Sequence, residues 1–110
     1  MKLPKSDRAT VPEDKLYGYL LSDTHPVGRG KARFFRAIGF TRDNAPTLEA
    51  ALLRLAKYQD VNDVETTPHG TKYTVDGGLE TPTGQTVLLR TVWIVEAGAE
   101  APRLVTAYPL

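Results

Sequence analysis

The residues of this chain best suited to chemistry lie together in the segment His25-Pro-Val-Gly-Arg-Gly-Lys31. Imidazole exchanges protons near neutral pH, as acid–base catalysis requires. The start of a helix offers free N–H groups and the positive end of the helix dipole, which both favour an anion, and glycines let the backbone approach a ligand closely. The segment therefore indicates a phosphate pocket at a helix start. The residues predicted to bind the phosphate are Gly28, Arg29, Gly30 and Lys31.

Lys31 differs from the arginines around it in the side of the predicted helix on which it falls. At about 100° per residue, Arg29, Arg33 and Arg36 fall together on one side, whereas the lysine falls on the apolar side. An unpaired ammonium group is costly to bury. Two interpretations of the lysine stay open: it binds an anion at the rim of the sheet, or it extends along the apolar face to solvent. The arginines fit an ordinary solvated helix face.

Positive charge is concentrated around this segment. Residues 24–42 hold five cationic side chains and no carboxylate, whereas the whole chain has a formal net charge of +1. The remainder of the chain therefore carries a net negative charge. A strongly basic protein is not required for binding RNA, because affinity depends on local phosphate contacts.

Polar residues also occupy notable positions in the predicted sheet. Arg90 and Thr91 lie in the middle of its strongest strand, on opposite faces. Thr106 and Tyr108 are predicted to share one face of the last strand with Leu104. A half-solvated sheet face explains such residues without any function, and a role in positioning a phosphate is the alternative.

The composition excludes several classes of site. The chain has no cysteine, which excludes disulfides, thiolate zinc sites, iron–sulfur clusters and a cysteine nucleophile. With two histidines, His25 and His69, a histidine-built metal site is not expected, and no cofactor is predicted. No apolar run approaches the roughly 20 residues that span a bilayer, and the first residues lack the apolar core of a secretion signal. We therefore expect a cytoplasmic protein without a membrane partner.

The first half of the chain has the periodicity of helices. Helices are predicted over residues 12–21, 28–38 and 44–59. The first carries an apolar stripe at Leu16, Tyr19 and Leu20. The third begins with Asn44 as its cap and Pro46 in its first turn.

The second half has the alternation of strands. Strands are predicted over residues 60–66, 71–76, 86–96 and 103–108, with turns at Gly77-Gly78 and at residues 81–85. Residues 86–96 are apolar on both faces, which indicates a central strand, and residues 60–66 suit an edge. The predicted fold class is α+β, with two or three N-terminal helices packed on one antiparallel sheet of about four strands. We expect a single domain over residues 1–110.

Three stretches carry a resemblance to a known family. They are HPVGRGKARFFRAIGF, RTVWIVE and PRLVTAYP, at residues 25–40, 90–96 and 102–109. Over about Leu3 to Pro109 the chain resembles a family of short bacterial proteins classed as the domain of unknown function numbered 6883. This resemblance implies a family and no activity.

A second resemblance implies an activity. A helical N-terminal half, a helix start with histidine, glycines and lysine, and a sheet that ends in LVTAYP are similar to the barnase–EndoU–colicin–RelE superfamily. That superfamily contains metal-independent ribonucleases, many of them toxins, which cleave RNA by attack of the 2′-hydroxyl on the neighbouring phosphate. The resemblance implies RNA as the substrate and a cognate antitoxin or immunity protein as the partner.

The same resemblance implies roles for single residues. The residues that it assigns to catalysis are His25, Lys31, Arg90, Thr106 and Tyr108. His25 would transfer the proton as base or acid. Lys31, with Arg29 or Arg90, would hold the phosphate and stabilise its developing charge. The two residues of the last strand would position it.

Functions of a different class stay open. The face formed by Arg29, Arg33 and Arg36 could serve a non-catalytic interaction module, similar to an antitoxin or an immunity protein. The chain could also be an α+β scaffold for a ligand unrelated to RNA. The sequence alone does not decide between the enzyme and these alternatives.

Overall fold

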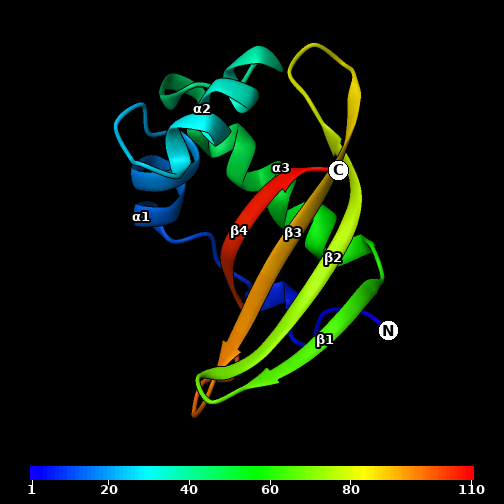
Figure 1. The fold of residues 1–110 in the computed structure, drawn as a ribbon. Coiled ribbons are helices and arrows are strands. Elements are labelled where there is room, and N and C mark those ends of the chain that lie inside the picture. Colours follow the sequence, from blue (N-terminus) through cyan, green and yellow to red (C-terminus); the bar gives the residue numbers. More distant parts are fainter.

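The computed structural model describes residues 1–110 and consists of short N-terminal helices, two longer helices and one sheet (Figure 1). The helical segments are η1 (Ser6–Arg8), α1 (Glu13–Lys15), η2 (Leu16–Leu20), α2 (Gly28–Ala37), η3 (Arg42–Asn44) and α3 (Ala45–Tyr58). The strands are β1 (Val61–Thr67), β2 (Gly70–Glu80), β3 (Thr86–Glu96) and β4 (Arg103–Pro109). The predicted α+β class is confirmed, with all helices before the strands.

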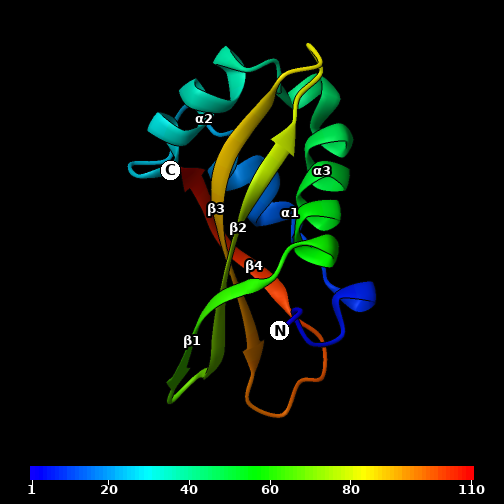
Figure 2. The ribbon, with the colours of Figure 1, turned by 90° about the vertical axis from the view of Figure 1, so that its right-hand side faces the viewer.

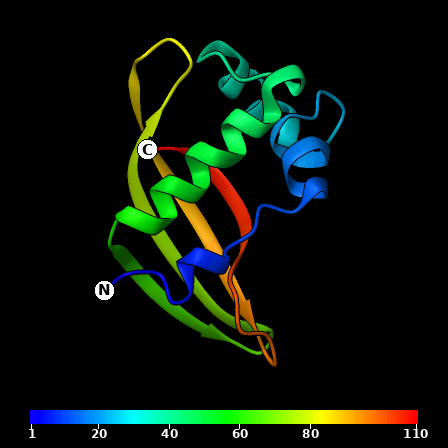
Figure 3. The same ribbon diagram turned by 180° about the vertical axis from the view of Figure 1, so that it is seen from behind.

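The four strands form an antiparallel meander in the order β1-β2-β3-β4. The predicted edge position of the first strand and the central position of β3 are therefore confirmed. Helix α3 lies diagonally across one face of the sheet (Figure 3), while α1 and α2 lie near the β4 edge (Figures 1 and 2). No helix of this structure has the length and apolar character needed to cross a membrane.

The core lies between α3 and the sheet face that it covers. Trp93 at the centre of β3 is fully buried, as are Leu48 and Leu52 of α3 and Phe35 of α2. Full burial of an aliphatic side chain contributes about 1.5–3 kcal/mol, so this layer holds α3 and α2 in place relative to β4. The helices and the last strand thus form a fixed frame for any site between them.

The first helix is shorter than predicted and continues as a π-helical turn. Pro12 precedes the first helical residue instead of occupying the first turn. In η2 the N–H of Leu21 donates to the carbonyl oxygen of Leu16 at 3.0 Å, which closes a wider turn than an α-helix has. Leu16 and Leu20 are buried as predicted, but Tyr19 is only half-buried. The wider turn presents this tyrosine to the side, towards β4.

The predicted end of α2 and the predicted N-terminal cap of α3 have different outcomes. Helix α2 ends as predicted before Gly39, whose φ of +101° suits glycine. Asn44 occupies the predicted N-cap position of α3, but its side chain makes no capping bond to that helix. Its Oδ1 accepts the N–H of Thr41 at 2.7 Å and its Nδ2 donates to Gly39 O at 2.9 Å, which closes the preceding 3₁₀ turn. Pro46 lies in the first turn of α3 as predicted.

The predicted turn at Gly77-Gly78 is also wrong, because β2 runs straight through both glycines to Glu80. A Cβ at Gly77 would lie 2.6 Å from Cγ of Gln59, at the end of α3. A Cβ at Gly78 would lie 2.5 Å from Cγ2 of Thr86 on the next strand. These glycines therefore allow neighbouring groups to approach the strand closely, which is the other common reason for glycine in a strand.

A β-bulge in β4 changes the face on which its polar residues lie. The register of β3 and β4 shifts between Val92 and Trp93, so that Val92 pairs with Thr106 while Trp93 pairs with Leu104. Leu104 faces the core, whereas Thr106 lies on the opposite face with Tyr108. The prediction that all three share one face is wrong, because a bulge inserts one extra residue into the alternation.

Candidate functional site

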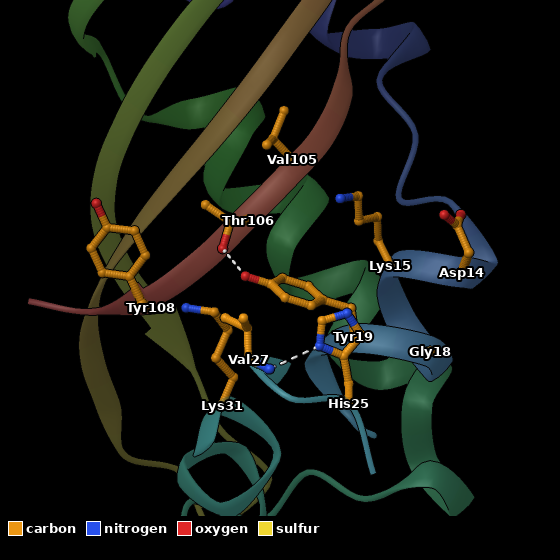
Figure 4. Close-up of a pocket in the computed structure, with 10 residues that line it drawn as sticks. All are labelled: Asp14, Lys15, Gly18, Tyr19, His25, Val27, Lys31, Val105, Thr106 and Tyr108. Atoms are coloured by element: carbon orange, nitrogen blue, oxygen red, sulfur yellow. Dashed lines mark hydrogen bonds between the residues drawn. The ribbon is translucent and has the colours of Figure 1, made fainter. Parts of the chain in front are cut away.

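The largest cavity lies at the β4 edge of the sheet, between η2, the start of α2 and β4 (Figure 4). Its volume is about 760 Å³, and it is open to solvent. The residues that line it are Asp14, Lys15, Gly18, Tyr19, His25, Val27, Lys31, Val105, Thr106 and Tyr108. Two neighbouring N-terminal segments and the distant last strand thus contribute to one cavity.

Four of the five residues predicted for catalysis line this cavity. His25 comes from the loop before α2, Lys31 from the first turn of α2, and Thr106 and Tyr108 from β4. The β-bulge described above turns the two β4 residues to this side of the strand. A volume of this size is within the range of cavities that bind small ligands.

Lys31 directs its ammonium group into the cavity. Its Nζ lies 5.0 Å from the ring centroid of Tyr108 and 5.7 Å from that of Tyr19. Such cation–π contacts hold an ammonium group between two aromatic faces while its N–H donors stay free. No carboxylate of the chain forms an ion pair with this lysine. The ammonium group is thus unpaired and lies in a cavity that is open to solvent.

His25 caps the start of α2. Its Nδ1 accepts the backbone N–H groups of Val27 and Gly28, each at 3.0 Å. A ring nitrogen that accepts hydrogen bonds carries no proton, so the neutral ring is assigned the tautomer with its proton on Nε2. The ring also packs edge-on against Tyr19, with centroids 5.1 Å apart. The two N–H groups expected to be free for an anion are thus occupied by the imidazole.

Arg90 lies beside the cavity and does not line it. Its Nε and Nη2 donate to the two carboxylate oxygens of Asp76 at 2.9 and 2.8 Å. It pairs across the strands with Tyr108. The pKa of the guanidinium is raised above its ordinary value, first by the hydrogen bonds to Asp76 and then by Tyr108. The guanidinium of Arg90 is thus paired with Asp76, and the link between Arg90 and the cavity is its cross-strand neighbour Tyr108.

The two glycines predicted to bind a phosphate, Gly28 and Gly30, do not line the cavity. A Cβ at Gly28 would lie 2.0 Å from the carbonyl oxygen of Tyr19, so this glycine lets α2 approach η2. Gly30 has no neighbouring atom within 4 Å of such a Cβ. Arg29 is exposed and does not line the cavity. Among the four residues predicted to bind a phosphate, Lys31 alone lines it.

Sequence reasoning missed two residues of the site, Tyr19 and Lys15. Tyr19 was assigned to the core stripe, but its hydroxyl shares a hydrogen bond of 3.0 Å with that of Thr106. Lys15 places its Nζ 5.2 Å from the centroid of the same tyrosine ring. Gly18, in the middle of an otherwise helical segment, was the available signal, because a glycine there suggests an irregular turn.

The geometry defines an α+β domain with a basic, aromatic cavity between its N-terminal helices and the last strand. A family model described as "Domain of unknown function (DUF6883)" matches residues 2–110, and the chain belongs to this family. A search of curated proteins finds no match.

The fold is shared with a solved structure. A chain of the contact-dependent growth inhibition toxin–immunity protein complex from Klebsiella pneumoniae 342 superimposes with a TM-score of 0.73 and 16% sequence identity. The match covers 94% of this chain and 95% of that chain. At this identity the comparison establishes a common fold over nearly the whole of both chains.

Proposed function

We propose that this domain is a metal-independent endoribonuclease of the toxin type. The observation that carries the proposal is the unpaired ammonium group of Lys31, held between Tyr19 and Tyr108 in a cavity that also contains His25 and Thr106. The fold shared with a chain of a toxin–immunity protein complex supports a module of a toxin–immunity pair, and the cavity is our reason for assigning the toxin side. The same match supports a cognate protein as the partner.

The proposed reaction breaks one phosphodiester bond. The 2′-hydroxyl oxygen attacks the neighbouring phosphorus and loses its proton, while the bond from phosphorus to the 5′ oxygen breaks and that oxygen takes up a proton. The products are a 2′,3′-cyclic phosphate and a 5′-hydroxyl. Lys31 is suited to stabilise the extra negative charge of the phosphorane, because it is fixed in place before the charge develops.

The remaining polar groups are assigned to proton transfer and positioning. The hydroxyls of Tyr19 and Thr106 share one hydrogen bond within the cavity, so the hydroxyl that accepts in this bond keeps its own proton free to donate to a phosphate oxygen. Proton transfer through His25 requires its Nδ1 to release the N–H groups of Val27 and Gly28. Once released, these N–H groups are donors for the phosphate at the start of α2.

The test is cleavage of RNA by the purified protein in the presence of EDTA. We expect fragments that end in a 2′,3′-cyclic phosphate, and a loss of at least about 100-fold in rate for Lys31→Gln, as expected for a group that stabilises transition-state charge. Lys57→Gln is the matched control, because Lys57 lies 5.6 Å from the ring of Tyr58 in the same kind of contact on α3. Cleavage that survives Lys31→Gln would sink the proposal.

The interaction module remains the competing function. The face of Arg29, Arg33 and Arg36 is exposed, although Arg36 donates to Asp23 at 2.6 Å. A module of this kind binds its partner equally well with Lys31→Gln and loses it with Arg29→Ala/Arg33→Ala. If the double arginine variant retains the partner and Lys31→Gln abolishes RNA cleavage, the enzyme is favoured.

A further inference from the structure

We propose that the cavity contains a second phosphate subsite, formed by Lys15, so that its ligand is a strand with at least two successive phosphates. This inference rests on the proposed function, because it describes how the same cavity would hold RNA. Lys15 belongs to α1, and Lys31 belongs to α2, on the other side of Tyr19 in Figure 4. The sequence pattern had assigned Lys15 no role.

The two lysines flank a single aromatic ring. Nζ of Lys15 lies 5.2 Å and Nζ of Lys31 lies 5.7 Å from the centroid of Tyr19. Neither ammonium group takes part in any ion pair of the chain. Each ammonium group is therefore without a counter-charge in the chain, and an anion at each lysine would supply one.

The rest of the lining suits the part of a strand between two phosphates. Val27, Val105 and the ring of Tyr19 give the same cavity apolar surfaces, and Val27 is 63% exposed. Bases of a single strand stack on such aromatic and apolar surfaces, while cations track the backbone. The alternation of cation, ring and cation therefore matches the alternation of phosphate, base and phosphate.

The one carboxylate of the lining does not cancel the Lys15 charge. Asp14 is exposed, forms no ion pair with Lys15, and points away from Tyr19 in Figure 4. Its charge weakens the binding of a phosphate at Lys15 without preventing it. Removing the Asp14 charge is expected to strengthen the binding of a phosphate at Lys15, whereas removing the Lys15 charge is expected to weaken it.

The experiment measures how binding depends on salt. The probe is a mixed-sequence 2′-deoxy decanucleotide, which has no 2′-hydroxyl to attack and so binds without being cut. Its affinity for the intact protein is measured by fluorescence anisotropy between 50 and 200 mM salt. Each phosphate contact to a single strand contributes about 0.7 to the slope of log K against log salt concentration.

Lys15→Gln should lower the slope by about 0.7 and the affinity at low salt by about tenfold. Lys31→Gln should lower the slope by a similar amount, and Asp14→Asn should raise the affinity about twofold. Lys57→Gln, which removes a lysine from a tyrosine outside the cavity, should change neither quantity.

A slope for Lys15→Gln equal to that of the wild-type protein overturns the second subsite. If the slope for Lys15→Gln is unchanged while the wild-type protein cuts RNA and Lys31→Gln does not, the second subsite fails and the proposed function stands. A wild-type protein that neither binds the decanucleotide nor cuts RNA overturns both. Circular dichroism of each variant distinguishes a lost contact from a lost fold.

Discussion

Gly28 and Gly30 lie two positions apart in α2 and should respond in opposite ways to the same substitution by alanine. At Gly28 the new Cβ would lie 2.0 Å from the carbonyl oxygen of Tyr19 and 2.8 Å from its carbonyl carbon. Both atoms belong to the backbone, so α2 must move away from η2. At Gly30 no atom lies within 4 Å of the new Cβ.

The expected free energies of unfolding differ by several kcal/mol. Overpacking of this kind costs typically about 1–3 kcal/mol, and contacts this short against backbone place Gly28→Ala near or above about 3 kcal/mol. Gly30→Ala should stabilise the protein by about 0.5–1 kcal/mol, because glycine is the poorer helix former. For a domain of this size, the difference corresponds to roughly 15 °C or more in Tm.

Urea unfolding followed by tryptophan fluorescence measures both values. Trp93 is the single tryptophan of the chain and is fully buried, so its emission reports unfolding directly. If the proposed function is right, Gly30→Ala should cut RNA at the rate of the wild-type protein, and this rate is measured alongside.

Two results would refute this reasoning. Wild-type stability in Gly28→Ala would show that the close contact with the Tyr19 carbonyl does not exist. Loss of RNA cleavage in a stable Gly30→Ala protein would show that this glycine lets the backbone approach a phosphate, as the sequence pattern first indicated.

Three further substitutions have defined outcomes. Thr91→Val removes the hydroxyl that accepts the indole N–H of Trp93 at 2.8 Å and should cost about 1–3 kcal/mol in urea unfolding, while Thr91→Ser keeps the bond. Arg103 lowers the pKa of the Glu96 carboxyl below its ordinary value of 4.5, so the pair stabilises the fold above that pH. The difference in unfolding free energy between wild type and Glu96→Gln should therefore be present at pH 7 and disappear as the pH falls below 4.5. Tyr19→Phe keeps the ring beside both lysines but loses the bond to β4, and should slow RNA cleavage about tenfold with less than about 1 kcal/mol lost in stability.

The long, strongly periodic elements were predictable from the sequence. Helix α2 and strand β3 begin and end within a residue of their predicted bounds, because α2 has a helical apolar period and β3 is a continuous apolar run between two turn sequences. Gly77 and Gly78 were assigned to a turn because local sequence does not show what approaches a strand from outside. The distant partner in this case is Gln59, at the end of α3.

The candidate site was predictable only in part. His25 and Lys31 stand out by residue type and by their place at a helix start, and both line the cavity. Thr106 lies there because of a bulge, which no alternation pattern reveals. Lys15 looks like any surface lysine of a short helix, and its importance depends on the ring of Tyr19 that the π-helical turn places beside it.

The cap that His25 provides makes two backbone amides sensitive reporters of the imidazole. The N–H groups of Val27 and Gly28 share one acceptor, Nδ1, so a rotation of the ring breaks both bonds at once. Their amide resonances should therefore move together whenever the ring turns towards a ligand. The orientation of one side chain and the order of the first turn of α2 are thus linked, and this link can be followed in the intact protein without any substitution.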